Sequence, residues 1–131
     1  MVVACGQCLG CRLDRSRMWA MRVVHEAAMH ESSCFITLTY RDPVECTDEQ
    51  LANGWHIPAD WSLHKDHLQK FWKRLRKAGF RVRYFGCGEY GDVCKHGLST
   101  TNDGERPHCP NCNLGRPHYH ACVFGFMRCR S

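Results

Sequence analysis

Arg116-Pro117-His118-Tyr119-His120-Ala121-Cys122-Val123-Phe124 is the stretch that decides the predicted fold, because residues that favour β structure follow one another through it. Side chains alternate between the two faces of a strand, so His118 and His120 point to one face while Tyr119 points to the other. Two neutral imidazoles side by side are a common beginning of a divalent-metal site. An H-x-H pair also occurs by chance in a chain with nine histidines, so the rest of the sequence is needed to distinguish a metal site from chance.

Two further strands are predicted around this stretch. Residues 34–40 are aromatic or β-branched almost throughout, which predicts a central strand that is covered on at least one face. Residues 81–89 alternate between apolar and polar and predict a second strand, and residues 118–126 form the third. Residues 90–115 are polar and rich in glycine, asparagine and threonine, so we expect a long hairpin that carries this segment as an insertion.

Two helices complete the predicted fold. Residues 12–30 place apolar side chains on one stripe, which predicts a helix with that stripe buried. The second helix is predicted from Ser62, as its N-cap, to Ala78, with Gly79 as its stop. Its buried face carries Leu68, Phe71, Trp72 and Leu75.

Composition limits the classes of protein to consider. The chain has 131 residues, enough for one domain, and no apolar run long enough to cross a membrane or to act as an export signal. Lysine and arginine exceed aspartate and glutamate by 18 to 13, which permits a nucleic-acid partner. The basic side chains expected to contact DNA, unless they are an ordinary solvated surface, are Lys73, Arg76, Lys77, Arg81, Arg83 and Arg116.

Eleven cysteines indicate metal binding rather than disulfides, because the number is odd and no export signal precedes them. The insertion carries Cys94, Cys109 and Cys112, which with His96 or His108 could form a structural zinc site; the alternative is a disordered loop with incidental cysteines. The N-terminal group Cys5, Cys8 and Cys11 is one ligand short of a closed zinc site, and free thiols are the alternative. A cytidine deaminase is excluded because neither H-x-E nor P-C-x-x-C is present.

Several motifs agree in their order along the chain with those of a known family. Phe35-Ile36-Thr37-Leu38-Thr39-Tyr40, Cys87-Gly88-Glu89-Tyr90-Gly91 and Arg116-Pro117-His118-Tyr119-His120 follow one another, and the chain opens with Cys5-Gly6-Gln7-Cys8-Leu9-Gly10-Cys11-Arg12. This pattern resembles the replication initiators of small single-stranded DNA phages, of the microvirus and gokushovirus-like group. Those initiators belong to the HUH endonucleases of rolling-circle replication.

The resemblance implies an α+β fold with a central antiparallel sheet and helices packed on it. It implies His118 and His120 as metal ligands and Glu89 as the acidic third ligand, holding Mg²⁺ or Mn²⁺ on a scissile phosphate. Two imidazoles and a carboxylate on adjacent strands also suit those ions by their donor atoms. The insertion is longer than the hairpin common in the family, so Asp92 or His108 could replace Glu89 if the insertion displaces it.

The family nicks single-stranded DNA at the viral origin with a tyrosine, which forms a phosphotyrosine intermediate and then joins the strand again. The resemblance places that tyrosine downstream of the histidines, and none of the four tyrosines here follows them. We therefore expect residues 1–131 to be one initiator domain that is incomplete at its C-terminus, with residues 90–115 as its cysteine- and histidine-rich insertion. We expect no catalytic tyrosine before Ser131, so this chain binds metal without nicking DNA.

The resemblance also implies work in the cytoplasm of a bacterial host, without a membrane partner and with host replication proteins as further partners. The alternative function is a zinc-stapled, non-catalytic module for single-stranded DNA, in which Trp72, Tyr84 and Phe85 either stack on bases or form core. A structural zinc protein without a nucleic-acid role ranks last.

Overall fold

The computed structural model describes residues 3–96, residue 109 and residues 112–128, with the side chains of residues 126–128 left aside. Three long strands form the centre: β1 (Ser33–Thr39), β2 (Phe80–Tyr90) and β3 (Pro117–Arg128). They pair antiparallel in the order β1-β3-β2, so the histidine strand β3 is central and hydrogen-bonded on both sides. The predicted α+β class with a central antiparallel sheet is confirmed.

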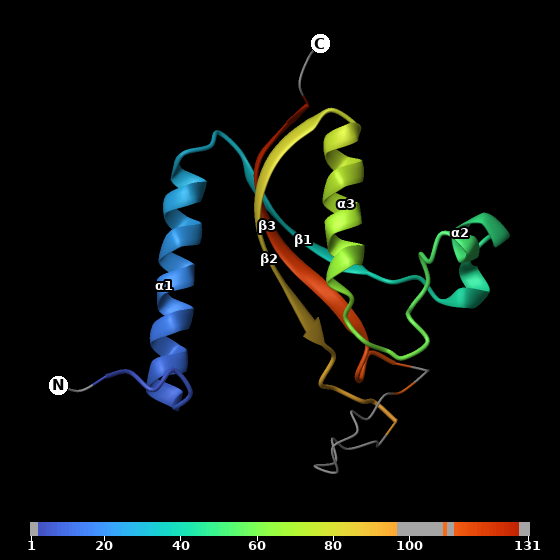
Figure 1. Cartoon of the computed structure of the whole chain (residues 1–131), viewed down its shortest axis with the longest axis horizontal. Helices are drawn as coiled ribbons and strands as arrows, with labels where there is room; N and C mark the ends of the chain where they lie inside the picture. Colours follow the sequence, from blue (N-terminus) through green and yellow to red (C-terminus); the bar gives the residue numbers. More distant parts are fainter. Residues whose placement is uncertain (1–2, 97–108, 110–111, 129–131) are drawn as a thin grey trace.

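Helix α3 (Lys65–Lys77) covers one face of the sheet (Figure 1). Trp72, only 1% exposed, stacks on Tyr84 with ring centroids 3.9 Å apart and belongs to the same buried cluster as Ala121 and Val123. The predicted buried face of this helix is confirmed, since its three other apolar residues pack against that cluster. Trp72 is therefore a core residue, and the suggestion that it stacks on bases is wrong. Tyr84, which is 38% exposed, packs on Trp72 without being buried itself.

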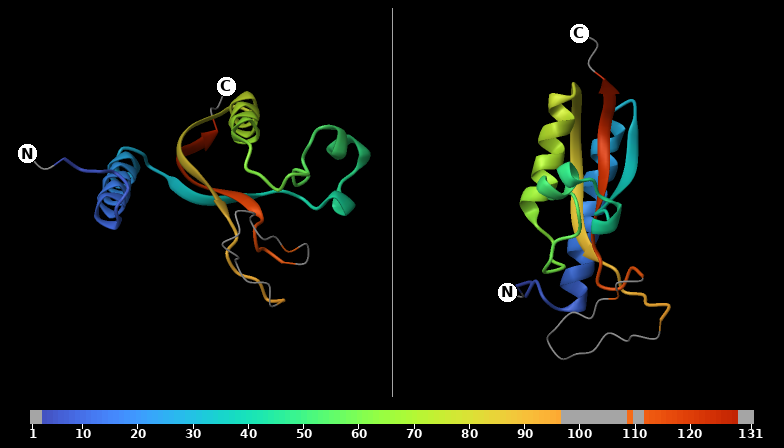
Figure 2. Two further views of the ribbon diagram at one scale, coloured as in Figure 1. Left: turned by 60° about the horizontal axis from the view of Figure 1, so that its bottom comes forward. Right: turned by 90° about the vertical axis from the view of Figure 1, so that its right-hand side faces the viewer.

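Helix α1 (Leu9–Ala28) lies on the opposite side of the sheet, as the two views in Figure 2 show. Its contacts are few: Trp19 meets the ring of Phe85 at 5.1 Å between centroids, and Glu26 pairs with Arg83. None of the α1 side chains, all of which the structure describes, is buried, and Leu13 and Val24 remain more than 60% exposed. The prediction that this helix buries an apolar stripe is therefore wrong for the described chain.

Two smaller differences concern the position of β1 in the sheet and the first residue of α3. Strand β1 lies at an edge of the sheet among the described strands, instead of in its centre as predicted. Helix α3 begins at Lys65 with His64 as its N-cap, because Ser62 bonds back to Asp60 instead of capping a helix. Its end matches the prediction, because Gly79 takes the left-handed conformation (φ +94°) that stops a helix cleanly.

The loop between β1 and α3 is not wholly irregular, because it contains a 3₁₀ turn, η1 (Pro43–Glu45), and a short helix, α2 (Asp48–Ala52). Thr47 caps α2 in a capping box with Gln50, which satisfies the first free backbone N–H groups. Within the described residues, no helix combines the length and apolarity that crossing a membrane requires.

Candidate metal centre

Glu89, His118 and His120 come together on the face of the sheet opposite α3. Glu89 pairs directly with His118 across the β2–β3 ladder, and His120 lies two residues further along β3, so strand alternation puts all three on one face. Glu89 Oε2 lies 3.0 Å from Nε2 of His120 and 3.6 Å from Nε2 of His118. One donor atom from each residue therefore lies within 4.8 Å of the others, which is the spacing of a three-ligand site.

Both imidazoles are held through their other ring nitrogen. Nδ1 of His118 lies 3.0 Å from the Arg116 carbonyl oxygen, which can only accept, so Nδ1 is the donor and Nε2 is the ligand atom in the neutral imidazole. Nδ1 of His120 lies 3.0 Å from the hydroxyl of Thr37, and Phe35 stacks on the same ring with centroids 5.4 Å apart. Outer partners of this kind orient metal-binding histidines.

The centre is open on its solvent side. The side chain of Glu89 is 59% exposed, whereas the two histidines are mostly covered by their neighbours. An open side leaves room for a phosphate oxygen or water as further ligands. The arrangement can hold a divalent ion on one flank and present it to a substrate on the other.

The insertion does not displace Glu89, so no substitute ligand is needed there. Asp92 belongs to none of the candidate metal groups that the described residues form, and His108 lies outside the described residues. Gly91 N donates to the Arg116 carbonyl at 3.1 Å, and Gly115 N donates to the Gly91 carbonyl at 2.7 Å. These bonds extend the ladder past Glu89 and fix its register.

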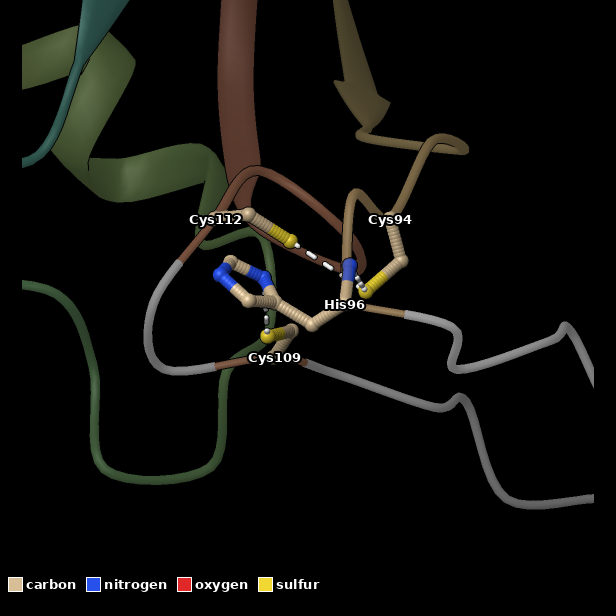
Figure 3. Close-up of side chains that lie close together, drawn as sticks. All are labelled: Cys94, His96, Cys109 and Cys112. Carbon is tan, nitrogen blue, oxygen red and sulfur yellow. Dashed lines mark hydrogen bonds between the residues drawn. The ribbon is translucent and has the colours of Figure 1, made fainter.

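A second group of ligands lies just beyond this ladder, in the base of the insertion. Cys94, His96, Cys109 and Cys112 converge from the two sides of the hairpin, with one donor atom of each within 4.8 Å of the rest (Figure 3). The sulfurs of Cys94 and Cys112 are 3.5 Å apart, and the sulfur of Cys109 lies 3.6 Å from Nδ1 of His96. Backbone donation, first of all from Leu114, lowers the pKa of Cys112 to about 6. Three thiols and one imidazole form the donor set of a closed zinc site.

The third group, Cys5, Cys8 and Cys11, surrounds the N-terminus of α1. The sulfurs of Cys5 and Cys11 are 3.8 Å apart, and the Cys8 side chain caps the helix by accepting from Cys11 N. Backbone hydrogen bonds from Cys8 and Gln7 lower the pKa of Cys5 to about 6. No fourth protein ligand joins this group among the residues that the structure describes.

The six basic residues expected at DNA differ in their surroundings. Lys73, Arg76, Lys77 and Arg81 are exposed on α3 and at the start of β2. Arg83 is also exposed but pairs with Glu26 of α1. Arg116 is largely covered, and its Nη2 donates to Asp42 Oδ1 at 2.8 Å and to the Tyr40 carbonyl at 3.1 Å. Arg116 thus ties β3 to the end of β1, in addition to any role at DNA.

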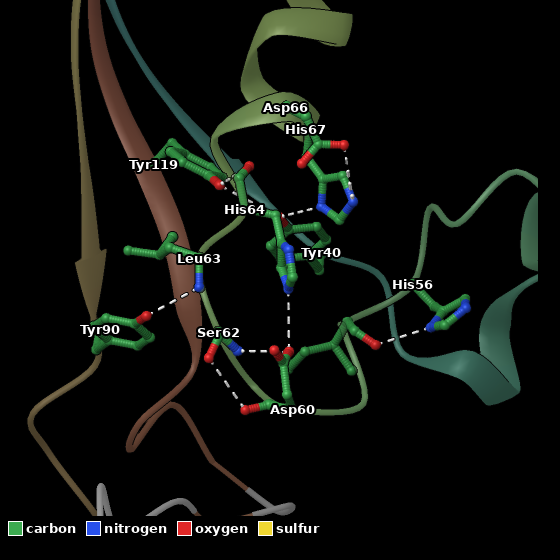
Figure 4. Close-up of polar contacts among 11 residues, drawn as sticks. Tyr40, His56, Asp60, Ser62, Leu63, His64, Asp66, His67, Tyr90 and Tyr119 are labelled. Atoms are coloured by element: carbon green, nitrogen blue, oxygen red, sulfur yellow. Dashed lines mark hydrogen bonds and ion pairs between the residues drawn. The ribbon is translucent and has the colours of Figure 1, made fainter.

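Three tyrosine hydroxyls hold the loop before α3 against the sheet (Figure 4). Tyr119 donates to the His64 carbonyl at 2.7 Å, Tyr90 accepts from Leu63 N at 2.9 Å, and the Tyr40 hydroxyl lies 2.7 Å from Nδ1 of His67. Burial, followed by the neighbouring Tyr119 hydroxyl, raises the pKa of Tyr40 well above its ordinary range. As predicted, Tyr119 lies on the opposite face from the two histidines between which it stands.

One feature was not predicted: a cavity of about 430 Å³ lies between the end of β1, the loop after α2 and helix α3. Trp55 and Arg74 line it, with the Arg74 guanidinium 5.9 Å from the centre of the Trp55 ring. These residues are far apart in the sequence and have no motif spacing, so only the fold brings them together.

Comparison with known proteins gives two relatives and no family or structural match. No family model matches the chain, and no solved structure does. The replication-associated protein of Bdellovibrio phage phiMH2K is 32% identical over 124 residues, which cover 93% of this chain and 31% of that protein. The replication-associated protein of Spiroplasma virus 4 is 30% identical over 128 residues, again 93% of this chain and 31% of the relative. The chain is therefore similar, over nearly all its length, to about a third of the replication-associated proteins of two viruses.

Proposed function

We propose that this chain is the metal-bearing part of a replication initiator of the HUH endonuclease type. In the full-length protein, that initiator nicks and joins single-stranded viral DNA at its origin through a phosphotyrosine intermediate. Two similarities support the proposal: the relatives are both replication-associated proteins, and the order of motifs matches that of the initiator family. The chain spans about 31% of each relative, so the complete reaction is proposed for the longer protein.

The observation that carries the proposal is the convergence of Glu89 Oε2 with Nε2 of both histidines. The donor set fits a hard divalent ion, because it offers one carboxylate and two imidazoles with open positions and no thiolate. A Mg²⁺ or Mn²⁺ ion bound there would supply Lewis-acid polarisation of the scissile phosphodiester. Thr37 and the Arg116 carbonyl are positioning groups, since they keep both Nε2 atoms turned toward the carboxylate.

The nucleophile is proposed to come from the rest of the full-length protein. A tyrosine phenolate oxygen attacks phosphorus and forms the phosphotyrosine bond, while the bond to the 3′ oxygen breaks and that oxygen leaves as a hydroxyl. The hydroxyls of Tyr90 and Tyr119 hold the loop before α3, the Tyr40 hydroxyl meets His67 of α3, and the Tyr84 ring stacks on Trp72. None of these four hydroxyls, all within the described residues, serves the metal centre.

The cysteine groups are proposed as zinc sites with a structural role. Cys94, His96, Cys109 and Cys112 would clip the base of the insertion, where few apolar residues are available to stabilise the chain. Cys5, Cys8 and Cys11 would bind zinc through three thiolates and leave one position for a ligand from outside the described chain.

The partner proposed for the exposed basic residues is single-stranded DNA. Lys73, Arg76, Lys77 and Arg81 offer a cationic surface to phosphates on α3 and the start of β2. An initiator of this kind would act in the cytoplasm of the bacterial host. Host replication proteins are proposed as additional partners.

Calorimetry of Mn²⁺ binding to zinc-saturated protein tests the proposal. We expect one Mn²⁺ site in the wild type and none in the double variant His118→Ala/His120→Ala. His25→Ala is the matched control, because His25 is an exposed histidine of α1 outside every ligand group of the described chain, and it should bind Mn²⁺ as the wild type does.

The result also decides between two functions. Absence of a Mn²⁺ site, or a site unchanged in the double variant, would favour a zinc-stapled, non-catalytic module for single-stranded DNA, which the cysteine clip and the basic surface support. A covalent DNA adduct formed by these 131 residues alone would contradict the proposed origin of the nucleophile.

A further inference from the structure

We propose that the cavity beside Trp55 binds one nucleotide of single-stranded DNA, with its base against Trp55 and Phe71 and its phosphate near Arg74 and Lys70. The inference rests on the proposed function, because it names where the DNA partner is held away from the metal centre. The cavity, of about 430 Å³, is within the size range of small-molecule sites in proteins.

The walls of the cavity combine aromatic and cationic side chains. Trp55, 48% exposed, and Phe71 offer ring surfaces, while Arg41, Lys70 and Arg74 contribute three cationic groups. No carboxylate lines the cavity among the described residues, although Asp66 pairs with Lys70 at 3.0 Å near its rim. Aromatic faces beside cations are what single-stranded nucleic acid requires, because bases stack and phosphates need positive charge.

The floor of the cavity is polar and already ordered. The Tyr40 hydroxyl and Nδ1 of His67 are 2.7 Å apart, and the Tyr119 hydroxyl, which donates to the His64 carbonyl, lies 3.4 Å from that of Tyr40 (Figure 4). Hydroxyl groups can both donate and accept, so they can meet the edge of any base. A floor of this kind favours a nucleobase over a purely apolar ligand.

Trp55 is held in place by the backbone around it. Trp55 N donates to the Gln50 carbonyl at 3.1 Å, and Arg41 N donates to the Trp55 carbonyl at 3.4 Å. Ile57, which is buried, donates to the Arg41 carbonyl at 3.0 Å and anchors the far side of the loop. The exposed ring is therefore presented by a fixed loop, which reduces the entropy lost when a base stacks on it.

The cavity and the metal centre lie on opposite faces of the sheet near one end of β1. Leu38 and Tyr119 pair across the β1–β3 ladder and line the cavity. Thr39 also lines the cavity and pairs with His118 of the metal centre across the same ladder. Because β1 is the edge strand of the described sheet, a single strand of DNA can pass around this edge from one site to the other. The cavity would then hold a nucleotide of the same strand away from the one that is cut.

Fluorescence anisotropy with a labelled thymidine oligonucleotide of about ten nucleotides, at low salt, tests the inference. We expect Trp55→Ala and Arg74→Ala each to weaken binding by about tenfold, the effect of losing one stacked base or its cationic partner. The matched controls are Trp19→Ala and Arg22→Ala, since Trp19 is also exposed and has the Arg22 guanidinium 4.9 Å from its ring centre, but neither lines the cavity.

The outcomes separate this inference from the proposed function. If Trp55→Ala binds the oligonucleotide as tightly as the wild type, or if Trp19→Ala loses as much affinity as Trp55→Ala, the cavity is not the nucleotide site. DNA would remain the partner in either case. Failure of the wild type to bind the oligonucleotide would overturn both. Photocrosslinking of the wild type with an iodouracil-substituted oligonucleotide avoids any doubt about folding of the variants: adducts at Trp55 or Phe71 support the inference, and adducts confined elsewhere overturn it.

Discussion

The pairing of Glu89 with His118 requires a glycine at residue 91. Gly91 lies where the insertion leaves β2 and crosses the Asn113 backbone closely enough that an added Cβ would overlap the Asn113 carbonyl oxygen and lie 2.7 Å from its carbon. The obstacle is backbone, so it cannot rotate away as a side chain would. The absence of a side chain at residue 91 is therefore a requirement of the ladder that positions the carboxylate.

Gly91→Ala is expected to lower the free energy of unfolding by about 2–3 kcal/mol, because the two sides of the hairpin must move apart. It should also weaken Mn²⁺ binding, since Glu89 moves with them. Gly86→Ala is the control: a Cβ there would lie 3.5 Å or more from its neighbours, which is ordinary contact. Urea unfolding and Mn²⁺ calorimetry measure the two effects, and equal stability of both variants would contradict the explanation.

At the scale of elements, α1 is the weakly attached one. Its side-chain contacts with the sheet include the Trp19–Phe85 rings and the Glu26–Arg83 pair, and none of its side chains is buried. Glu26 also accepts from Nε2 of His30 at 2.8 Å, so one carboxylate joins the helix, the turn after it and β2.

The attachment of α1 should depend on pH through Glu26. The hydrogen bond from His30, and then the charge of Arg83, hold the pKa of this carboxylate below its ordinary 4.5. A lowered pKa in the folded state means that the stabilising contribution is complete above pH 4.5 and is lost as pH falls through the lowered value. Amide exchange of α1 is followed by mass spectrometry and corrected for the intrinsic slowing of exchange in acid, and the resulting protection factors of the wild type should fall in acid. Glu26→Gln should be less protected at neutral pH and lose little more in acid, whereas identical pH profiles would refute this role.

Sequence patterns predicted the elements whose partners are close in the chain. Residues of α3 repeat with helical spacing, and β2 and β3 alternate, so their buried faces could be read directly. The position of β1 could not be read, because an apolar strand such as Phe35-Ile36-Thr37-Leu38 has the same composition at an edge as in the centre. The exposed stripe of α1 was also unpredictable, since amphipathic spacing shows that a face can be buried and does not show what buries it.

At the scale of the whole molecule, candidate ligands of different chemistry occupy one hairpin. The carboxylate and histidines lie in the ladder, and the cysteines lie in the insertion immediately beyond it. The two histidines and the cysteines of the insertion could be singled out because they come in short sequence pairs, H-x-H and C-x-x-C, whereas Glu89 was expected only from the resemblance to the initiator family. The cavity beside Trp55 was not predictable, because its walls come from three separate segments.

Zinc removal should destabilise the molecule. If Cys94, His96, Cys109 and Cys112 bind zinc, free zinc at a hundred times its dissociation constant stabilises the folded state by about 2.7 kcal/mol. A chelator removes this contribution. Cys109→Ser should unfold at a lower urea concentration than the wild type and respond less to zinc, because its side chain is buried in the clip. Cys34→Ser, an exposed cysteine outside the ligand groups, should retain the zinc response. Equal unfolding of the wild type with zinc and with chelator would contradict a structural zinc.

If both ligand groups bind metal as proposed, the short separation between Glu89 and Cys94 along the chain should make binding at one group depend on binding at the other. A slip of one residue between β2 and β3 would turn Glu89 to the wrong face, and the cysteine clip opposes that slip. Filling the clip should therefore raise affinity at the Glu89–His118–His120 centre, and by reciprocity Mn²⁺ should tighten zinc binding by the same factor. Positive cooperativity of this kind would make a chain with one metal bound more ready to take the second, so partly loaded molecules would be rare.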